Sequence, residues 1–210
     1  GAMGNVAIML PMISCLDEVQ QVRRIMQELH QELAAQNLPH APLLPLGVMV
    51  ETPAAALICD ALARECDFFS IGTNDLIHYI MGIDRNNRHV AYLNEPLHPA
   101  VVRSLKHIID AAHREGIGVS VCGELASDPF GLALLLGMGV DTVSAAPRFV
   151  PGMKHLIRQF NAQACMDLAN SVLLSTDVAA SKRMVREALQ QSLGQELAFH
   201  TTSLFTHSHP

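Results

Sequence analysis

Short apolar runs alternate along this chain with longer segments in which apolar residues recur at helical spacing. The first apolar runs cover residues 6–12 and 46–51, and a helical pattern covers residues 16–35 between them. The same rhythm predicts further strands at residues 68–71, 118–122 and 142–144, and further helices at residues 54–64, 99–115 and 129–136. Apolar strands that alternate with helices are typical of a parallel sheet covered by helices. The pattern therefore predicts an α/β fold with five strands.

Five strands are too few for a closed eight-stranded barrel. A closed (β/α)8 TIM barrel usually takes about 250 residues, whereas this chain has 210 residues. We expect a truncated TIM barrel at residues 5–160, a helical extension at residues 161–198 and a flexible tail at residues 199–210. Within the extension, Asp177 is expected to cap a helix that runs through Leu189.

Composition and charge narrow the range of partners. Apolar residues make up 50% of the chain, which is enough to build a folded core. The 14 Lys and Arg residues are outnumbered by 20 Asp and Glu residues, and no basic run occurs. This balance argues against nucleic acid as a partner. An anionic ligand would have to be held locally, by a metal ion, a few arginines and backbone N–H groups.

Cysteines and apolar runs indicate the compartment. The five cysteines are odd in number and form no C-x-x-C pair, which predicts neither a disulfide framework nor a structural zinc site. No apolar run reaches the roughly 18 residues that span a bilayer, and residues 1–4 lack the features of a signal peptide. We expect a cytoplasmic protein without membrane insertion.

Carboxylates follow two neighbouring strands of the expected sheet. Glu51 ends the second strand, and Asn74 and Asp75 follow the third, where the chemistry of barrels of this kind is found. Two such acids suit Mg²⁺, whose shell is completed by water and by the oxygens of an anionic substrate. A purely structural interpretation remains for each. Glu51 could cap the next helix, because a negative charge is favourable at a helix N-terminus, and residues 73–75 could form a capped turn.

Two further side chains belong to the same edge. Arg85 lies in a polar loop after Asp75, and its guanidinium matches the geometry of phosphate or carboxylate. Cys122 ends the fourth strand, where a thiol could donate a proton to a carbanionic carbon. Alternatively, Arg85 belongs to a solvated surface turn. The other four cysteines are interpreted as small apolar residues.

Four motifs carry a family resemblance. The stretches GVMVETPAA, FFSIGTNDL, DRNN and CGELASD occur in the order and spacing found in the carboxyl-terminal phosphoenolpyruvate-binding barrel of enzyme I. Enzyme I is the phosphoenolpyruvate–protein phosphotransferase of the bacterial sugar phosphotransferase system. The resemblance runs from about residue 6 to residue 160 and implies a TIM barrel of the phosphoenolpyruvate/pyruvate type, here reduced to its last βα units.

The resemblance also implies a function for each candidate residue. In that family the residues that match Glu51 and Asp75 bind Mg²⁺, and those that match Asn74 and Arg85 hold the substrate anion. The residue that matches Cys122 protonates the enolate to give pyruvate. The phosphoryl group passes to a phosphohistidine domain and on to a histidine-containing carrier protein for sugar uptake. A homodimer is also implied.

The chain departs from the family pattern in three ways. It has no Thr-Ser-His context for a phosphorylated histidine, and it lacks the earlier barrel strands with their arginines, so this fragment is expected to be inactive alone. After Asp75 it reads Leu76-Ile77-His78-Tyr79. That difference indicates a paralogue, such as the enzyme I portion of a multiphosphoryl transfer protein.

Three alternatives to enzyme I remain open. Pyruvate phosphate dikinase and phosphoenolpyruvate synthase share the metal acids and the cysteine, although VETPAA and CGELASD favour enzyme I. A Mg²⁺-dependent lyase acting on oxaloacetate-like substrates would need the same enolate-stabilising metal. A dimerisation module without turnover would explain how the exposed edges of an incomplete barrel are covered.

Overall fold

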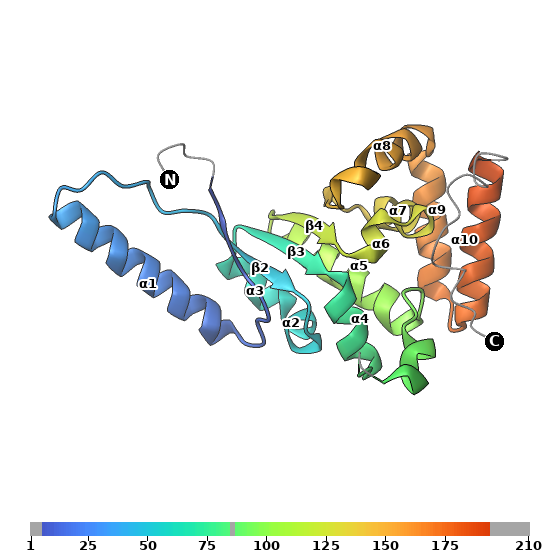
Figure 1. Ribbon diagram of the computed structural model, residues 1–210, viewed down its shortest axis with the longest axis horizontal. Helices are drawn as coiled ribbons and strands as arrows, with labels where there is room; N and C mark the ends of the chain where they lie inside the picture. The colour runs from blue at the N-terminus through green and yellow to red at the C-terminus, as the bar shows by residue number, and fades with distance from the viewer. Residues whose placement is uncertain (1–5, 85–86, 194–210) are drawn as a thin grey trace.

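The computed structural model describes residues 6–84 and 87–193 and contains one parallel sheet in the order β1-β2-β3-β4-β5 (Figure 1). The strands are β1 (Ile8–Leu10), β2 (Leu46–Val50), β3 (Phe68–Gly72), β4 (Gly118–Cys122) and β5 (Thr142–Val143). The helices are α1 (Leu16–Ala35), α2 (Pro53–Leu57), α3 (Cys59–Glu65), α4 (Thr73–Met81), α5 (Pro99–Arg114), α6 (Glu124–Ser127), α7 (Pro129–Met138), α8 (Val150–Gln159), α9 (Ala162–Leu174) and α10 (Val178–Leu193), with short 3-10 helices η1 (Arg88–Leu93) and η2 (Pro147–Phe149). The predicted α/β fold with five strands, which agrees with a truncated barrel, is confirmed.

The two faces of the sheet differ more than apolar runs alone predict. Strand register aligns Val50 with Ile71 and Ile71 with Val121, and all three are fully buried. On the opposite face the register aligns Ser70 with Ser120, which is only half-buried. One face therefore belongs to the apolar core beneath the helices, while on the other face Ser70 and Ser120 lie in register with Met49.

Helix starts follow recognisable capping chemistry. Thr52 caps α2 by accepting a hydrogen bond from the backbone N–H of Ala55, with proline at the first helical position. Asp128 caps α7 in the same way. Asp177 accepts from the N–H groups of Ala179 and Ala180, which confirms its predicted cap at the start of α10.

The helix expected at residues 54–64 is two helices in the structure. Helices α2 and α3 meet at Ile58, whose backbone (φ −107°, ψ 18°) leaves the helical region. The possible turn at residues 73–75 is the first turn of helix α4, which runs to Met81 and was not predicted. This short helix begins with the polar residues Thr73, Asn74 and Asp75, a run that is also typical of a loop.

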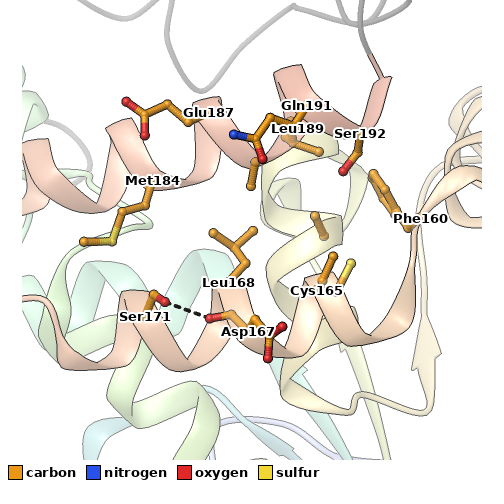
Figure 2. A pocket seen from close by; sticks show the side chains of 13 residues that line it. Phe160, Cys165, Asp167, Leu168, Ser171, Met184, Glu187, Leu189, Gln191 and Ser192 are labelled. Carbon is orange, nitrogen blue, oxygen red and sulfur yellow. Dashed lines mark hydrogen bonds between the residues drawn. The ribbon is translucent and has the colours of Figure 1, made fainter.

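Helices α7, α9 and α10 pack together at the end of the molecule opposite α1 (Figure 1). Arg103 of α5 donates hydrogen bonds to the backbone oxygens of Leu173 and Ser175, where α9 ends. A groove of about 390 Å³ lies between α7, α9 and α10, with Cys165 and Leu168 in its lining (Figure 2). The division of the chain at residue 160 stays a prediction, and the tail expected at residues 199–210 lies outside the described residues.

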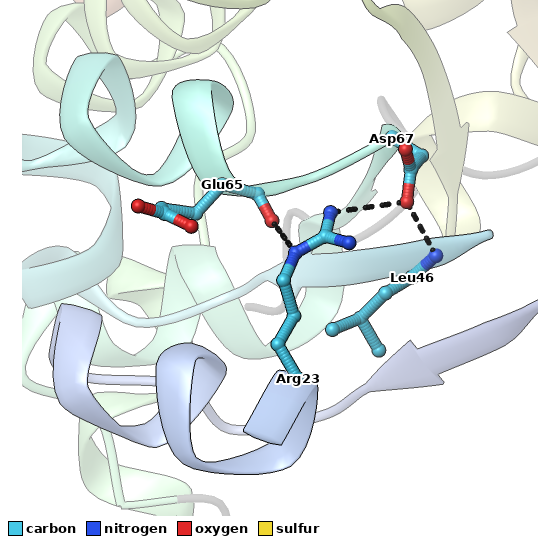
Figure 3. A network of polar contacts seen from close by, with 4 residues as sticks. All are labelled: Arg23, Leu46, Glu65 and Asp67. Atoms are coloured by element: carbon cyan, nitrogen blue, oxygen red, sulfur yellow. Dashed lines mark hydrogen bonds and ion pairs between the residues drawn. The ribbon is translucent and has the colours of Figure 1, made fainter. Parts of the chain in front are cut away.

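Helix α1 is tied to the amino ends of β2 and β3 by one polar network (Figure 3). Arg23 donates to the backbone oxygen of Glu65 at 2.8 Å and to Asp67 Oδ2 at 3.1 Å. The same Asp67 oxygen accepts from the backbone N–H of Leu46 at 2.7 Å. This network lies at the end of the strands opposite the candidate site. Within the residues described, no helix is both long and apolar enough to cross a membrane.

Candidate functional site

The candidate residues gather at the carboxyl ends of three adjacent strands. The register aligns Val50 of β2 with Ile71 of β3, so Glu51, the next residue, lies beside Gly72. Gly72 in turn is aligned with Cys122 of β4. The order of the sheet thus brings together residues far apart in the sequence, as expected for chemistry at the carboxyl edge of a parallel sheet.

Glu51 is a buried carboxylate, with 4% of its surface exposed. Its Oε1 accepts a 2.8 Å hydrogen bond from the backbone N–H of Met12, a residue with a left-handed backbone (φ 55°). A Cβ added to Gly72 would lie 2.7 Å from Glu51 Oε2. The absence of a side chain at Gly72 therefore makes room for the Glu51 carboxylate.

Helix α4 begins directly after β3 and carries Asn74 and Asp75 in its first turn. Asp75 is half-buried. Asn74 Oδ1 accepts a 3.0 Å hydrogen bond from the backbone N–H of Glu124, which links the first turn of α4 to the start of α6. This bond identifies the oxygen of the amide, because only the oxygen can accept from an N–H group. Arg85 lies outside the described residues.

Cys122 differs from the other cysteines in its surroundings. It is half-buried, and its thiol donates to the backbone oxygen of Ile71 at an S–O distance of 3.5 Å. Burial raises the pKa of Cys59 to about 11 and that of Cys66 to about 12, and it also raises the pKa of Cys165. These three thiols suit the predicted apolar interpretation. Cys15 is exposed, at the start of α1.

Two contributors were missed by sequence reasoning. Thr73 is fully buried, and its hydroxyl donates a 2.7 Å hydrogen bond to the backbone oxygen of Cys122. Met12 holds Glu51 through its backbone, which no side-chain motif reveals. The available signal for Thr73 was its position between Gly72 and Asn74, at the junction of a strand and a helix.

The donor set at this edge fits a magnesium ion that shares its shell with substrate. Among residues 6–84 and 87–193, no group of three or more His, Cys, Asp or Glu side chains is placed to hold a metal. Glu51 and Asp75 provide two carboxylates, and Mg²⁺ is often held by one or two carboxylates together with substrate phosphate and water. The buried Glu51 carboxylate, which accepts a hydrogen bond from the backbone N–H of Met12, is chemically suited to bind a cation.

Comparison with known proteins connects this geometry to a family. The family model described as "PEP-utilising enzyme, PEP-binding domain" matches residues 1–162. A phosphoenolpyruvate-protein phosphotransferase of Bacillus sp. (strain S) is 44% identical over 81% of this chain and 29% of its own length. A multiphosphoryl transfer protein of Escherichia coli O6:H1 is 41% identical over 79% of this chain and 20% of its own length.

The structural comparison supports the barrel-like fold. A citrate lyase from Burkholderia xenovorans LB400 superimposes with a TM-score of 0.56 over 94% of this chain and 65% of that chain, at 16% identity. The chain spans less than a third of the length of each of the two sequence relatives described above. The family match and the sequence relatives together show that the chain belongs to the family of phosphoenolpyruvate-binding domains of phosphoenolpyruvate-utilising enzymes.

Proposed function

We propose that this chain supplies the phosphoenolpyruvate site of a phosphoenolpyruvate–protein phosphotransferase. The observation that carries the proposal is the alignment of Glu51, Gly72 and Cys122 across three strand ends, within a chain of this family. Glu51 and Asp75 would hold Mg²⁺, which supplies charge neutralisation for the phosphoryl oxygens when it is bound. This arrangement accounts for a buried carboxylate and a partly accessible thiol on one edge.

Asn74 and Arg85 would hold the substrate anion. The Oδ1 atom of Asn74 is already occupied by the N–H of Glu124, so the Nδ2 hydrogens are the part of this amide that can donate to an anion. The role of Arg85 rests on the sequence resemblance. Asp75, next to Asn74 in the first turn of α4, would contact both metal and substrate.

Cys122 would supply the proton that completes the reaction. The P–O bond of phosphoenolpyruvate breaks with its electron pair left on the enolate oxygen, and a new P–N bond forms to a histidine of another domain. The Cys122 S–H proton then passes to the terminal carbon of the enolate, which gives pyruvate and a thiolate. The thiolate regains a proton from solvent before the next turnover.

The partners follow from the same proposal. The phosphohistidine domain would pass the phosphoryl group to the histidine-containing carrier protein that serves sugar uptake. The protein would act in the cytoplasm as a homodimer. The isolated fragment would be inactive, since the relatives it matches are about three times as long or longer.

Replacement of Cys122 tests the proposal directly. In the full gene product, Cys122→Ala should lower the rate of pyruvate formation from phosphoenolpyruvate by about 100-fold or more, the range of a general acid. Mg²⁺ binding, measured by calorimetry, should stay within about twofold, which corresponds to less than about 0.5 kcal/mol. Cys15→Ala, at the exposed cysteine, serves as the matched control. Unchanged pyruvate formation, or loss of Mg²⁺ binding in Cys122→Ala, would contradict the assignment.

A further inference from the structure

The turn that carries Cys122 is held from one side by the residues that begin α4. Thr73 Oγ1 donates a 2.7 Å hydrogen bond to the backbone oxygen of Cys122. The backbone N–H of Glu124 donates a 3.0 Å hydrogen bond to Asn74 Oδ1. These two bonds fix the two peptide units that flank Gly123. Consecutive side chains of one strand-to-helix corner therefore control the backbone on both sides of a single glycine.

Gly123 permits this close approach. Its backbone has φ +99° and ψ −175°, a conformation that is essentially restricted to glycine. A Cβ at this position would lie 2.3 Å from Thr73 Oγ1 and 2.8 Å from Asn74 Oδ1. Thr73 is fully buried, so water cannot readily replace its hydroxyl. The turn thus depends on Thr73 for the hydrogen bond to the Cys122 oxygen.

The hydroxyl of Thr73 does not serve as an ordinary helix cap. Thr52, at the start of α2, accepts a hydrogen bond from the backbone N–H of Ala55 in its own helix. Gly72 is the N-cap residue of α4, which has no side-chain cap, and Thr73 donates across to β4 instead. Its hydroxyl thus bonds to Cys122, the residue proposed as the proton donor.

Cys122 is bonded twice to the same segment of β3 and α4. Its thiol donates to the backbone oxygen of Ile71, and its own backbone oxygen accepts from Thr73. We infer that Thr73 is a positioning residue, which holds the Cys122 thiol where its proton can reach the enolate carbon; this inference rests on the function proposed above. Displacement of a reacting group by about 1 Å can slow a reaction about 100-fold.

Steady-state turnover of the full gene product gives the first test. Thr73→Val keeps the shape of the side chain and removes the donor, whereas Thr73→Ser keeps the donor. We expect Thr73→Val to lower kcat for pyruvate formation on the order of 10- to 100-fold. KM for phosphoenolpyruvate and the Mg²⁺ concentration for half-maximal rate should stay within about twofold, and Thr73→Ser should restore kcat to within about threefold.

Three results of that experiment would overturn the inference. An unchanged kcat in Thr73→Val would remove the positioning role. A parallel loss of kcat, phosphoenolpyruvate affinity and Mg²⁺ affinity would make Thr73 a general support of the site. Equal loss in Thr73→Ser and Thr73→Val would show that the hydroxyl is not the group that matters.

Alkylation of Cys122 gives a second test that needs no substrate. A Cys15→Ser background removes the exposed cysteine and leaves Cys122 as the only one of the remaining four that is not buried. We expect Thr73→Val to change the rate of reaction with iodoacetamide by about fivefold, as loss of a bond of about 1 kcal/mol allows. Thr52→Val is the matched control and should leave the alkylation of Cys122 unchanged.

The two tests separate the inference from the proposed function. If the wild-type protein forms no pyruvate from phosphoenolpyruvate, the proposed function fails, while alkylation still reports whether Thr73 positions the thiol. Alkylation that is the same with Val and Thr at position 73 would overturn the inference. If Thr73→Val does not fold, Thr73→Ala replaces it, because the smaller side chain adds no crowding beside Gly123.

Discussion

The two carboxylate oxygens of Glu51 have different surroundings. Oε1 accepts the N–H of Met12, whereas Oε2 occupies the space left open by the missing side chain of Gly72. A buried charge is unfavourable unless hydrogen bonds or a cation compensate it. The backbone bond from Met12 compensates the Glu51 charge in part, and a bound metal ion would compensate it further.

Loss of the charge at Glu51 should weaken metal binding without unfolding the protein. In Glu51→Gln the side-chain oxygen can still accept from Met12, so the local fold should be retained. We expect Mg²⁺ affinity to fall by about 10- to 100-fold, a loss of about 1.4 to 2.8 kcal/mol. Calorimetric titration with Mg²⁺ measures this loss of affinity. Glu124→Gln, at an exposed carboxylate on the same edge, is the control and should leave Mg²⁺ affinity unchanged.

A methyl group at position 72 should displace the Glu51 carboxylate. The Cβ of Gly72→Ala would lie 2.7 Å from Glu51 Oε2 and 3.0 Å from Glu51 Cβ. We expect Mg²⁺ affinity to fall and the free energy of unfolding to drop by about 1 to 3 kcal/mol, as in other overpacked sites. Chemical denaturation measures the second effect.

Gly118→Ala is the matched control for that variant. The nearest atom to its added Cβ would be Asp141 Oδ2 at 3.9 Å, which is an ordinary contact. Mg²⁺ affinity should be unaffected. Equal loss of Mg²⁺ affinity in both variants would contradict the role given to Gly72.

At the scale of elements, a single carboxylate joins the amino end of β4 to α5. Asp141, just before β5, accepts from the backbone N–H of Val119 at 2.8 Å and contacts His113 Nε2 at 3.0 Å. The N–H of Val119, and then the hydrogen bond to His113, lower the pKa of Asp141 below its ordinary value of 3.8. The depressed pKa means that ionised Asp141 is favoured in the folded state.

The pH dependence of stability should reveal this link. A carboxylate with a depressed folded pKa stabilises the fold above its unfolded pKa, and this contribution is lost as pH falls through the folded pKa. Asp141→Asn should therefore be less stable than wild type at pH 6, and the difference should shrink as pH falls below 3.8. Urea denaturation at several pH values measures it. A difference that grows toward low pH would contradict the link.

Much of the element pattern could be predicted from the sequence. Helix α1 matches the expected residues 16–35, and every expected strand is present. Their signals are local: apolar periodicity, and caps such as Asp177. Helix α4 was missed because it has only nine residues, and its N-cap residue, Gly72, offers no side-chain cap that would mark the start of a helix.

The site could be predicted only in part. Glu51 and Cys122 could be placed at one edge of the sheet because each ends a predicted strand, and the carboxyl ends of parallel strands lie at the same edge. The hydrogen bond of Thr73 joins the start of α4 to the end of β4, and that of Met12 joins the segment after β1 to the residue after β2, over separations of 49 and 39 residues. Such contacts depend on register and backbone geometry, which a single sequence does not encode in a local motif.

At the scale of the whole molecule, the sheet has two unpaired edges among the residues described. On its outer side β1 pairs with no described strand, and the same is true of β5. Met9, on β1, is 40% exposed. Unpaired edges with exposed apolar side chains favour association with another chain.

The isolated 210-residue chain should therefore associate at its β1 edge. A charge introduced by Met9→Lys should raise the dissociation constant by about tenfold, or about 1.4 kcal/mol. Analytical ultracentrifugation over a range of concentrations measures it. Met166→Lys, on α9 with 41% exposure, is a matched control remote in the fold from that edge. A chain that stays monomeric throughout would contradict this prediction.

We propose that the carboxyl edge of this sheet binds phosphoenolpyruvate together with Mg²⁺. Isothermal titration of the full gene product with phosphoenolpyruvate, in Mg²⁺ and in excess EDTA, measures this binding. Glu51→Gln provides the matched variant. We predict saturable heat of binding in Mg²⁺, which is lost in EDTA and strongly reduced in Glu51→Gln. No binding in Mg²⁺, or equal binding in EDTA, would show that this edge is not a Mg²⁺-dependent phosphoenolpyruvate site.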